Sequence, residues 1–224
     1  MRQLKLSKRL GTAAQFVCDG AVVADIGTDH AYIPIYLVQS GKASRAIATD
    51  INEGPLGRAN ENVALYELED KITTYIANGL DGIEAYAPDD IVICGMGGEL
   101  IADIIDKCNY VRNSDKNLIL QPMTTILELR EYLKNGFEIT DETVVYEDGK
   151  YYQIICARYD GQAHEYSKIE LELGKINIKK REAVFLKMLD FCIAKKKKIR
   201  DGLLKGGCDT AEIEKEIEEM EKLR

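Results

Sequence analysis

The sequence has few of the features that mark membrane, secreted or zinc-binding proteins. No apolar run approaches the roughly 20 residues of a membrane-spanning helix, and residues 1–5 are not followed by the apolar core of a signal peptide. The six cysteines are scattered and form no C-x-x-C pair, so neither a zinc site nor a disulfide framework is indicated. We therefore expect a cytoplasmic protein that uses no membrane and no metal.

Tryptophan is absent and proline is scarce, with four residues, but the rest of the composition is that of an ordinary globular protein. Hydrophobic residues make up 46% of the chain and charged residues 30%. The 224 residues are enough for one domain of about 150 residues with a full core and a smaller additional segment.

Acidic residues outnumber basic ones over most of the chain, which argues against nucleic-acid binding. The C-terminal segment has the opposite balance. Residues 1–159 hold 15 Lys and Arg against 24 Asp and Glu, whereas residues 168–205 hold 12 against 5. A basic segment on an acidic protein can still contact phosphates, because charges more than about 10 Å away are screened by salt. The same segment is equally consistent with a solvated helix face.

The stretch over 22–32 has too few glycines for a dinucleotide-binding loop. Such a loop follows the first strand as G-x-G-x-x-G, so that the backbone can approach a pyrophosphate. Here only Gly27 fits, and Asp29 places a negative charge where a phosphate would lie. This pattern disfavours an NAD-dependent dehydrogenase. A ligand with a cationic centre and two ribose hydroxyls, such as S-adenosylmethionine (AdoMet), suits the acidic residues better.

Alternating strand and helix patterns predict an α/β fold. We expect parallel strands over 21–25, 45–50, 71–77, 91–94 and 117–120. Helices are expected over 4–17, 32–40, 55–68, 99–107 and 124–135, with a short one ending at Tyr86. Two further strands, over 137–147 and 151–158, meet at an Asp-Gly turn that favours a hairpin. This layout is typical of a class I (Rossmann-like) methyltransferase domain, whose seven-stranded sheet carries its seventh strand antiparallel.

The C-terminal part has a different pattern. Residues 161–174 read as a linker, and apolar residues then follow the 4-3 spacing of one helix face, with Lys196 as the exception. Gly206 and Gly207 end that helix, and residues 209–212 match a capping box for another. We expect a methyltransferase domain over 1–160 and an antiparallel, coiled-coil-like helical hairpin over 161–224.

Polar residues and glycines at three strand ends are candidate ligand contacts. Asp50 ends the second strand, where a carboxylate can accept hydrogen bonds from both ribose hydroxyls; alternatively it caps the next turn. Asn78 can pair with an adenine edge, although Asn-Gly is also a favourable turn. Residues 95–98 (Gly-Met-Gly-Gly) would let a planar ring and a sulfonium approach the backbone, or would form a tight strand-to-helix turn.

Asp29 allows two interpretations that a substitution can separate. It is either the N-cap of the following helix or the acceptor of a hydrogen bond from the exocyclic amine of a target base. Asn at this position would keep the cap but lose most activity if the charge matters. His30, Tyr32 and the pair at 151–152 are possible stacking surfaces for a base, or else belong to the core or its rim.

Five motifs together resemble the bacterial tRNA (adenine-22-N1)-methyltransferases. They lie at 6–10, 25–34, 54–55, 95–98 and 118–122. The similarity covers about residues 3–158, and the C-terminal helical pair matches the two-domain plan of that family. The resemblance implies an AdoMet-dependent enzyme that methylates N1 of an adenine in the D-arm region of tRNA without a metal.

The resemblance also implies site residues. Asp29 corresponds to the aspartate of the first motif, and we assign it the catalytic role. We expect the cofactor to contact Asp25, Gly27, His30, Asp50, Ile51, Asn78, Gly79, Gly95 and Met96. Substrate contacts are expected from Lys8, Arg9, Tyr32, Gly97, Gln121, Lys195, Lys196, Lys197, Lys198 and Arg200. Two positions depart from the family pattern: Asn78 stands where Asp is common, and Met123 where Asn is frequent.

The reaction that we expect is in-line methyl transfer to N1 of an unpaired or flipped adenosine, because N1 lies on the Watson–Crick edge. Two alternatives remain open: a small-molecule methyltransferase, and a non-catalytic AdoMet-binding or coiled-coil interaction protein. The sequence slightly favours a monomer.

Overall fold

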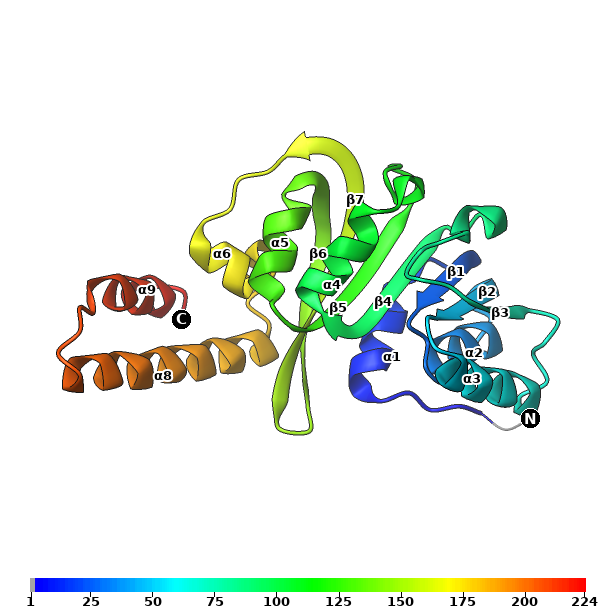
Figure 1. Ribbon diagram of the computed structural model, residues 1–224. Coiled ribbons are helices and arrows are strands. Elements are labelled where there is room, and N and C mark those ends of the chain that lie inside the picture. The colour runs from blue at the N-terminus through cyan, green and yellow to red at the C-terminus, as the bar shows by residue number, and fades with distance from the viewer. Residues whose placement is uncertain (1–2) are drawn as a thin grey trace.

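The computed structural model describes residues 3–224, and its centre is one seven-stranded sheet with helices on both faces (Figure 1). The strand order is β3-β2-β1-β4-β5-β7-β6. Strands β1 to β5 pair in parallel, and β7 is antiparallel to both β5 and β6. This arrangement confirms the predicted fold class. The strands are β1 (Ala21–Ile26), β2 (Ala43–Asp50), β3 (Ile72–Ile76), β4 (Asp90–Gly97), β5 (Asn117–Thr124), β6 (Asn135–Glu147) and β7 (Lys150–Ala163).

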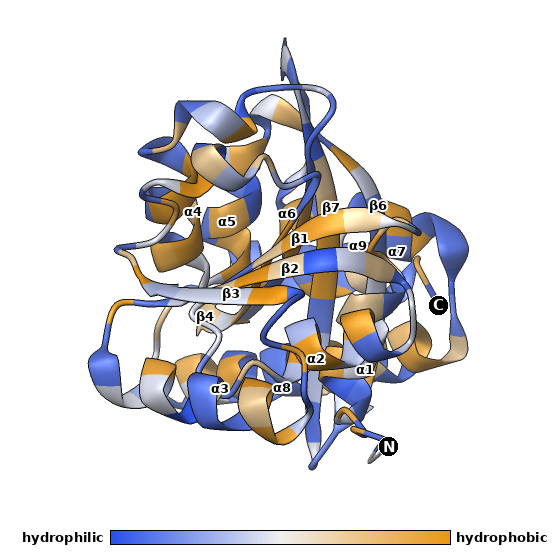
Figure 2. Ribbon diagram, turned by 90° about the vertical axis from the view of Figure 1, so that its right-hand side faces the viewer, coloured by the Kyte–Doolittle hydropathy of each residue, from blue (hydrophilic) through white to orange (hydrophobic). Residues whose placement is uncertain are grey.

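The helices of this domain fall into two layers (Figure 2). One layer packs with the core residues Val23 and Ala46, and consists of α1 (Lys8–Gln15), α2 (Tyr32–Gln39) and α3 (Glu53–Leu65). The other packs with Ala24 and Ile91, and consists of α4 (Gly98–Asp106) and α5 (Ile126–Leu133), with the short 3₁₀ helices η1 (Ile83–Tyr86) and η2 (Asn109–Val111). Because consecutive residues of a strand point to opposite faces, the apolar central strands fill both cores.

The predicted loop over 95–98 is wrong in detail. Residues 95–97 form the end of β4, where the register with β5 shifts twice, and α4 starts at Gly98. A Cβ on Gly98 would lie 2.1 Å from the carbonyl oxygen of Thr125. Only glycine therefore lets β4 turn into α4 against the end of β5.

The predicted linker over 161–174 is also wrong. Strand β7 continues to Ala163, and α6 (Lys168–Leu173) follows it. A capping box joins Ser167 and Glu170, and α6 buries Ile169, Leu171 and Leu173. A glycine at position 174 separates α6 from α7 (Lys175–Lys180). The apolar residues of α6 were visible in the sequence, but a six-residue helix is too short to show a clear period.

The C-terminal helical pair consists of α8 (Ala183–Lys205) and α9 (Ala211–Glu221), as predicted. The ion pairs Asp190–Arg224 and Lys197–Glu221 connect the helices in opposite order along the chain, so the pair is antiparallel. The predicted capping box at 209–212 is absent, because the Thr210 side chain makes no cap bond. Asp209 instead accepts a hydrogen bond from the backbone N of Ala211 at 3.0 Å.

A third apolar cluster joins this pair to the β6–β7 hairpin. It unites Val144 of β6 with residues of α6, α8 and α9, among them Phe185, Leu189 and Ile217. Figure 1 shows α8 starting beside the hairpin and extending away from the sheet. No helix among residues 3–224 combines the length and the hydropathy that a membrane span requires.

Candidate active site

A cavity of about 330 Å³ lies at the carboxyl ends of β1 and β4. These two strands are neighbours although they are not consecutive in the chain, so the cavity lies where the strand order reverses. Doubly wound sheets bind their ligands at such a switch point. The lining residues are Arg9, Leu10, Asp25, Gly27, Thr28, Asp29, His30, Tyr32, Ile33, Cys94 and Gly95. Seven of the predicted site residues are thereby brought together.

The Asp25 carboxyl is the buried acid of the cavity. It is only 5% exposed, and Thr28 donates a hydrogen bond to it through Oγ1 at 2.6 Å. The pKa of Asp25 is raised to about 7, mainly by burial; the hydrogen bond from the Thr28 hydroxyl lowers it, and the nearby Asp50 carboxylate adds a smaller increase. Asp25 therefore titrates near neutral pH. A cation that enters the cavity would favour the ionised form of its carboxyl.

The wall beside Asp25 is made of backbone and a thioether. Gly27 has a φ of 70°, and a Cβ there would lie 2.1 Å from the methyl carbon of Met96. Gly95 has a φ of 85°, also in the left-handed region that favours glycine. Gly97 is closer to β5, because its Cβ would lie 3.3 Å from Oγ1 of Thr124. Burial raises the pKa of the Cys94 thiol strongly, so this lining residue is neutral and not a nucleophile.

Asp50 lies at the end of β2. Its carboxylate caps the next turn, which was one of the two alternatives for this residue. Its Oδ1 accepts a hydrogen bond from the backbone N of Asn52 at 3.0 Å, and Oδ2 accepts one from the backbone N of Asp29 at 3.4 Å. The predicted cofactor residues Ile51 and Asn78 are exposed at the same edge of the sheet. Gly79 packs against α4, since its Cβ would lie 3.1 Å from Ile104.

Asp29 is not the N-cap of α2, so that interpretation was wrong. The N-cap is Ala31, and no side chain bonds to it. The Asp29 side chain is 55% exposed, and Oδ1 accepts a hydrogen bond from Nη2 of Arg58 on α3 at 2.6 Å. Oδ2 lies 3.4 Å from Nε2 of His30. The His30 ring stacks on Tyr32, with centroids 5.0 Å apart. Asp29 therefore presents a carboxylate to the cavity beside two flat rings.

Arg9 closes the cavity on the side of α1. Its guanidinium lies 5.4 Å from the centroid of the Tyr152 ring and donates to the amide oxygen of Gln121, and its backbone N donates to Glu147 Oε1 at 3.1 Å. Gln121 is fully buried. We therefore assign Gln121 to holding Arg9 in place of the predicted substrate contact. Lys8 is exposed on the same helix.

Comparisons with known proteins agree with this geometry. The profile of a family described as "Methyltransferase domain" matches residues 6–155. The tRNA (adenine(22)-N(1))-methyltransferase of Bacillus subtilis (strain 168) is 41% identical over 192 residues, which cover 84% of this chain and 81% of that protein. The chain belongs to the tRNA (adenine(22)-N(1))-methyltransferase family.

Solved structures similar to this member of the tRNA (adenine(22)-N(1))-methyltransferase family extend over the whole chain. The crystal structure of the B. subtilis m1A22 tRNA methyltransferase has a TM-score of 0.79 and 35% identity, over 98% of this chain and 96% of that one. A Streptococcus pneumoniae candidate tRNA (m1A22) methyltransferase, in complex with S-adenosyl-L-methionine, has a TM-score of 0.86 and 32% identity, over 98% of this chain and 99% of that one. Both likenesses include the C-terminal helices.

The basic residues of α8 differ in their surroundings. Lys196 lies on the apolar face of α8, where its charge is paired with two carboxylates. Its ammonium is 2.9 Å from Glu172 of α6 and 2.8 Å from Glu216 of α9. It is 15% exposed. We therefore remove Lys196 from the predicted substrate contacts, since it joins three helices. Lys197 pairs with Glu221 at 2.6 Å, and Arg200 pairs with its neighbour in sequence at 2.6 Å.

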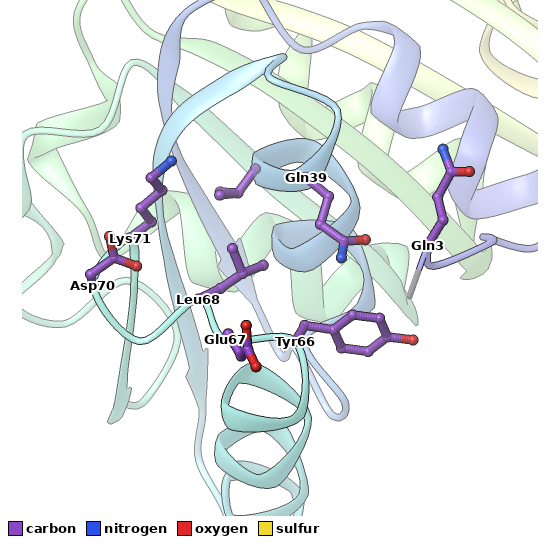
Figure 3. A pocket seen from close by; sticks show the side chains of 8 residues that line it. Gln3, Gln39, Tyr66, Glu67, Leu68, Asp70 and Lys71 are labelled. Atoms are coloured by element: carbon purple, nitrogen blue, oxygen red, sulfur yellow. The ribbon is translucent and has the colours of Figure 1, made fainter. Parts of the chain in front are cut away.

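A larger cavity of about 470 Å³ lies away from this site. Figure 3 shows that Gln3, Gln39 of α2 and the turn between α3 and β3 surround it. It lies where α2 and α3 end and β3 begins, which is the opposite edge of the sheet from the carboxyl ends of the strands. Beside this cavity the backbone N of Leu4 donates to Gln39 Oε1 at 3.1 Å. This hydrogen bond holds the N-terminal segment against α2.

Two residues that hold the acids of the site, Thr28 and Arg58, were missed from the sequence, as were the lining residues Leu10, Ile33 and Cys94. Thr28 was passed over although it lies between Gly27 and Asp29, where a hydroxyl can reach back to the strand. Arg58 gave no signal, because it is 29 residues from Asp29 and only the packing of α3 against β2 and β3 brings them together. Within residues 3–224, no group of three or more His, Cys, Asp or Glu is placed to hold a metal ion.

Proposed function

We infer that this protein is an AdoMet-dependent tRNA methyltransferase that methylates N1 of adenosine 22. The observation that carries the proposal is the acidic cavity at the switch point, in which the buried Asp25 and the exposed Asp29 lie beside the glycine-lined end of β4. Its relatives support the choice, since the B. subtilis protein is named for this reaction and the S. pneumoniae structure contains the cofactor. A structure of an M. capricolum relative contains the cofactor product S-adenosyl-homocysteine.

The residues present fit a cationic cofactor. Asp25 is a buried carboxyl whose pKa is about 7, and it has one hydrogen bond from Thr28 and no cationic partner among residues 3–224. We assign to the cofactor the residues at the ends of β1 to β4, with Asp50 on the ribose hydroxyls and Asn78 on the adenine edge. The Asp50 oxygens already accept two backbone hydrogen bonds, and each has a second lone pair for a hydroxyl.

When bound, AdoMet supplies a methyl group on a positively charged sulfur. Neutral adenine already offers the N1 lone pair, so the protein removes no proton before the attack. Its task is to place N1 in line with the methyl group and to stabilise the positive charge that the purine gains. Oδ1 of Asp29 is held by Arg58, which leaves Oδ2 to accept a hydrogen bond from the exocyclic amine. That bond strengthens as the ring becomes cationic, which lowers the barrier.

The affinity for AdoMet should depend on pH through Asp25. The pKa of about 7 means that the carboxyl is neutral below pH 7 and ionised above it. Because a cationic ligand binds a carboxylate more strongly than a carboxylic acid, we expect affinity to rise between pH 6 and pH 8, by at most about tenfold per unit, and then to level off. Titration calorimetry of wild type and Asp25→Asn measures this dependence. An unchanged slope in Asp25→Asn would assign it to another group.

The direct test is methylation of tRNA. Purified protein is incubated with an unmodified tRNA transcript and methyl-labelled AdoMet, and the digested RNA is mapped for 1-methyladenosine. We expect label at position 22 alone. A protein that binds AdoMet but leaves the transcript unlabelled would be a binding protein, and label on small molecules only would indicate a different acceptor.

The remaining assignments are part of the same proposal. The methyltransferase domain over 1–160 carries the chemistry, and the helical region over 161–224 contributes to tRNA binding through Lys195 and Lys198, which are exposed on α8. Lys8, Arg9, Tyr32 and Gly97 complete the substrate site. We expect a cytoplasmic monomer, in keeping with a tRNA substrate.

A further inference from the structure

Three aromatic side chains meet where the β6–β7 hairpin touches α8. Tyr146 and Tyr151 face each other across the hairpin, with ring centroids 4.8 Å apart. Phe191 of α8 lies 5.7 Å from Tyr151. Phe191 is 57% exposed and Tyr146 is 46% exposed, so both rings present open surface. We call Tyr146, Tyr151 and Phe191 the aromatic platform.

Only part of the platform fills the core beneath it. Tyr151 packs against the third apolar cluster, whose buried residues on α8 are Phe185, Met188, Leu189 and Ile193, whereas Tyr146 and Phe191 are not part of that cluster. Isolated apolar side chains are common on protein surfaces, but two exposed rings that adjoin the same third ring are not. The platform is therefore a surface that is open to a ligand.

Lysines surround the exposed ring of Phe191. Lys187 lies four residues before Phe191, and Lys195 and Lys198 lie four and seven residues after it, which places all three on the same face of α8 as Phe191. All three are exposed, and among residues 3–224 none has an acidic group within ion-pair distance. Of the neighbouring acids, Asp190 pairs with Arg224 and Glu147 with Arg9, whereas Asp148 is exposed at the hairpin turn. This face therefore combines aromatic rings with unpaired positive charge.

The combination identifies the kind of ligand. Exposed rings flanked by lysines are how proteins hold unpaired bases of RNA, because the ring stacks on the base while the lysines contact the adjoining phosphates. The other face of the hairpin carries Tyr152, which lies against Arg9 at the active site. Figure 1 shows the hairpin between α1 and α8, so one RNA that crosses the hairpin tip can reach both surfaces.

We propose that the aromatic platform stacks a second unpaired nucleobase of the tRNA, different from the target adenosine, while Lys187, Lys195 and Lys198 bind the flanking phosphates. The proposal rests on the proposed function and adds to it a subsite outside the catalytic cavity. The platform fixes the position of the tRNA while the target base enters the cavity on the opposite side of the hairpin.

Kinetics with conservative variants tests the stack. Phe191→Leu keeps an apolar side chain but removes the ring, and should raise KM for the tRNA transcript at least about fivefold, the lower end of the loss expected for one base stack. Because the platform is distant from the chemistry, kcat and the KM for AdoMet should stay unchanged. Phe191→Tyr keeps a ring and should restore the KM of wild type. Equal KM values for Phe191→Leu and wild type would overturn the proposal.

Fluorescence gives a direct readout, because the chain contains no tryptophan. Phe191→Trp places a single indole on the platform, and stacking of a base should quench its emission when the tRNA transcript is added. Leu65→Trp is the matched control: Leu65 is 57% exposed at the end of α3, away from the platform, and should show no quenching. Quenching that depends on protein concentration without RNA would instead indicate self-association and would contradict the proposal.

The salt dependence of binding tests the lysines. Lys195→Ala and Lys198→Ala should each lower the slope of log affinity against log salt by about 1. Lys168→Ala is the control, because Lys168 of α6 is already paired with Glu212 and Glu216. If wild type methylates the transcript while the platform variants bind it normally, the platform proposal fails and the proposed function stands. If wild type does not methylate tRNA, the proposed function fails first.

Discussion

Asp29→Asn should lower kcat for tRNA methylation by about 100-fold or more while AdoMet binding stays unchanged. Asparagine has the same shape and still offers an oxygen acceptor, so the geometry of the site is kept and only the charge is lost. The purine becomes cationic as the methyl group arrives, and a charge that is aligned with this change acts more on the transition state than on the bound substrate. Single-turnover rates with saturating AdoMet and transcript measure the effect.

Two controls distinguish the loss of the Asp29 charge at the site from the general effect of removing a surface carboxylate. Asp19→Asn is the matched variant, because Asp19 is an exposed aspartate that pairs with Lys42 at 3.5 Å, far from the cavity. It should retain wild-type kcat. The thermal stability of Asp29→Asn should be close to that of wild type, since Asp29 does not cap α2 and its ion pair with Arg58 is exposed. A variant that keeps its kcat would remove Asp29 from the mechanism.

The sheet could be predicted because the residues of each strand show which of its two faces are buried. Runs such as Ile91 to Cys94 are apolar on both faces, and the residues that end each strand must meet at one edge of a parallel sheet. Asp25, Asp29 and Gly95 were placed together on that basis, and all three line the cavity. The switch point between β1 and β4 was not predicted, because it depends on a strand order that no single strand determines.

Contacts between distant segments could not be predicted in the same way. Lys196 looked like part of a phosphate-binding block, but Glu172 and Glu216 approach it from two other helices. The antiparallel pairing of the two helices was predicted, but the count of charges over 168–205 left out the acidic residues of α9 that pair with the lysines of α8. The capping motif at 209–212 failed for a local reason, because Asp209 bonds the helix start without help from Thr210.

Removing residues 161–224 would not be a clean test of the C-terminal helices. Arg130 of α5 is completely buried and donates to the carbonyl oxygen of Leu171 in α6 at 2.9 Å. It also donates through Nε to Glu142 of β6 at 2.8 Å, and Glu142 Oε2 accepts from the backbone N of Ile176 in α7 at 3.0 Å. The truncated chain would leave the buried guanidinium of Arg130 without its carbonyl acceptor and the buried carboxylate of Glu142 without its backbone donor, so loss of activity would report misfolding.

Arg130→Ala should destabilise the whole protein by about 3–5 kcal/mol, because it leaves the Glu142 charge buried without a partner. The side chains of Arg130 and Glu142 are 0% and 1% exposed, so water cannot replace the lost hydrogen bonds. Urea denaturation followed by circular dichroism gives the free energy of unfolding, and we expect a lower midpoint with an unchanged slope. Arg112→Ala is the matched control, since Arg112 pairs with Asp106 at 2.9 Å but is 32% exposed. Its cost should stay below about 1 kcal/mol.

The pair also predicts a partial recovery. Arg130→Met combined with Glu142→Gln removes both charges and keeps side chains of similar size, so the double variant should unfold less easily than Arg130→Ala. Full recovery is not expected, because the carbonyl oxygen of Leu171 and the amide oxygen of Gln153 at 2.8 Å would still lose their donor. Since these groups attach α6 to the sheet, the remaining loss measures how firmly the C-terminal helices are held to the catalytic domain. A double variant less stable than Arg130→Ala would mean that the network is held by its hydrogen bonds and not by its charges.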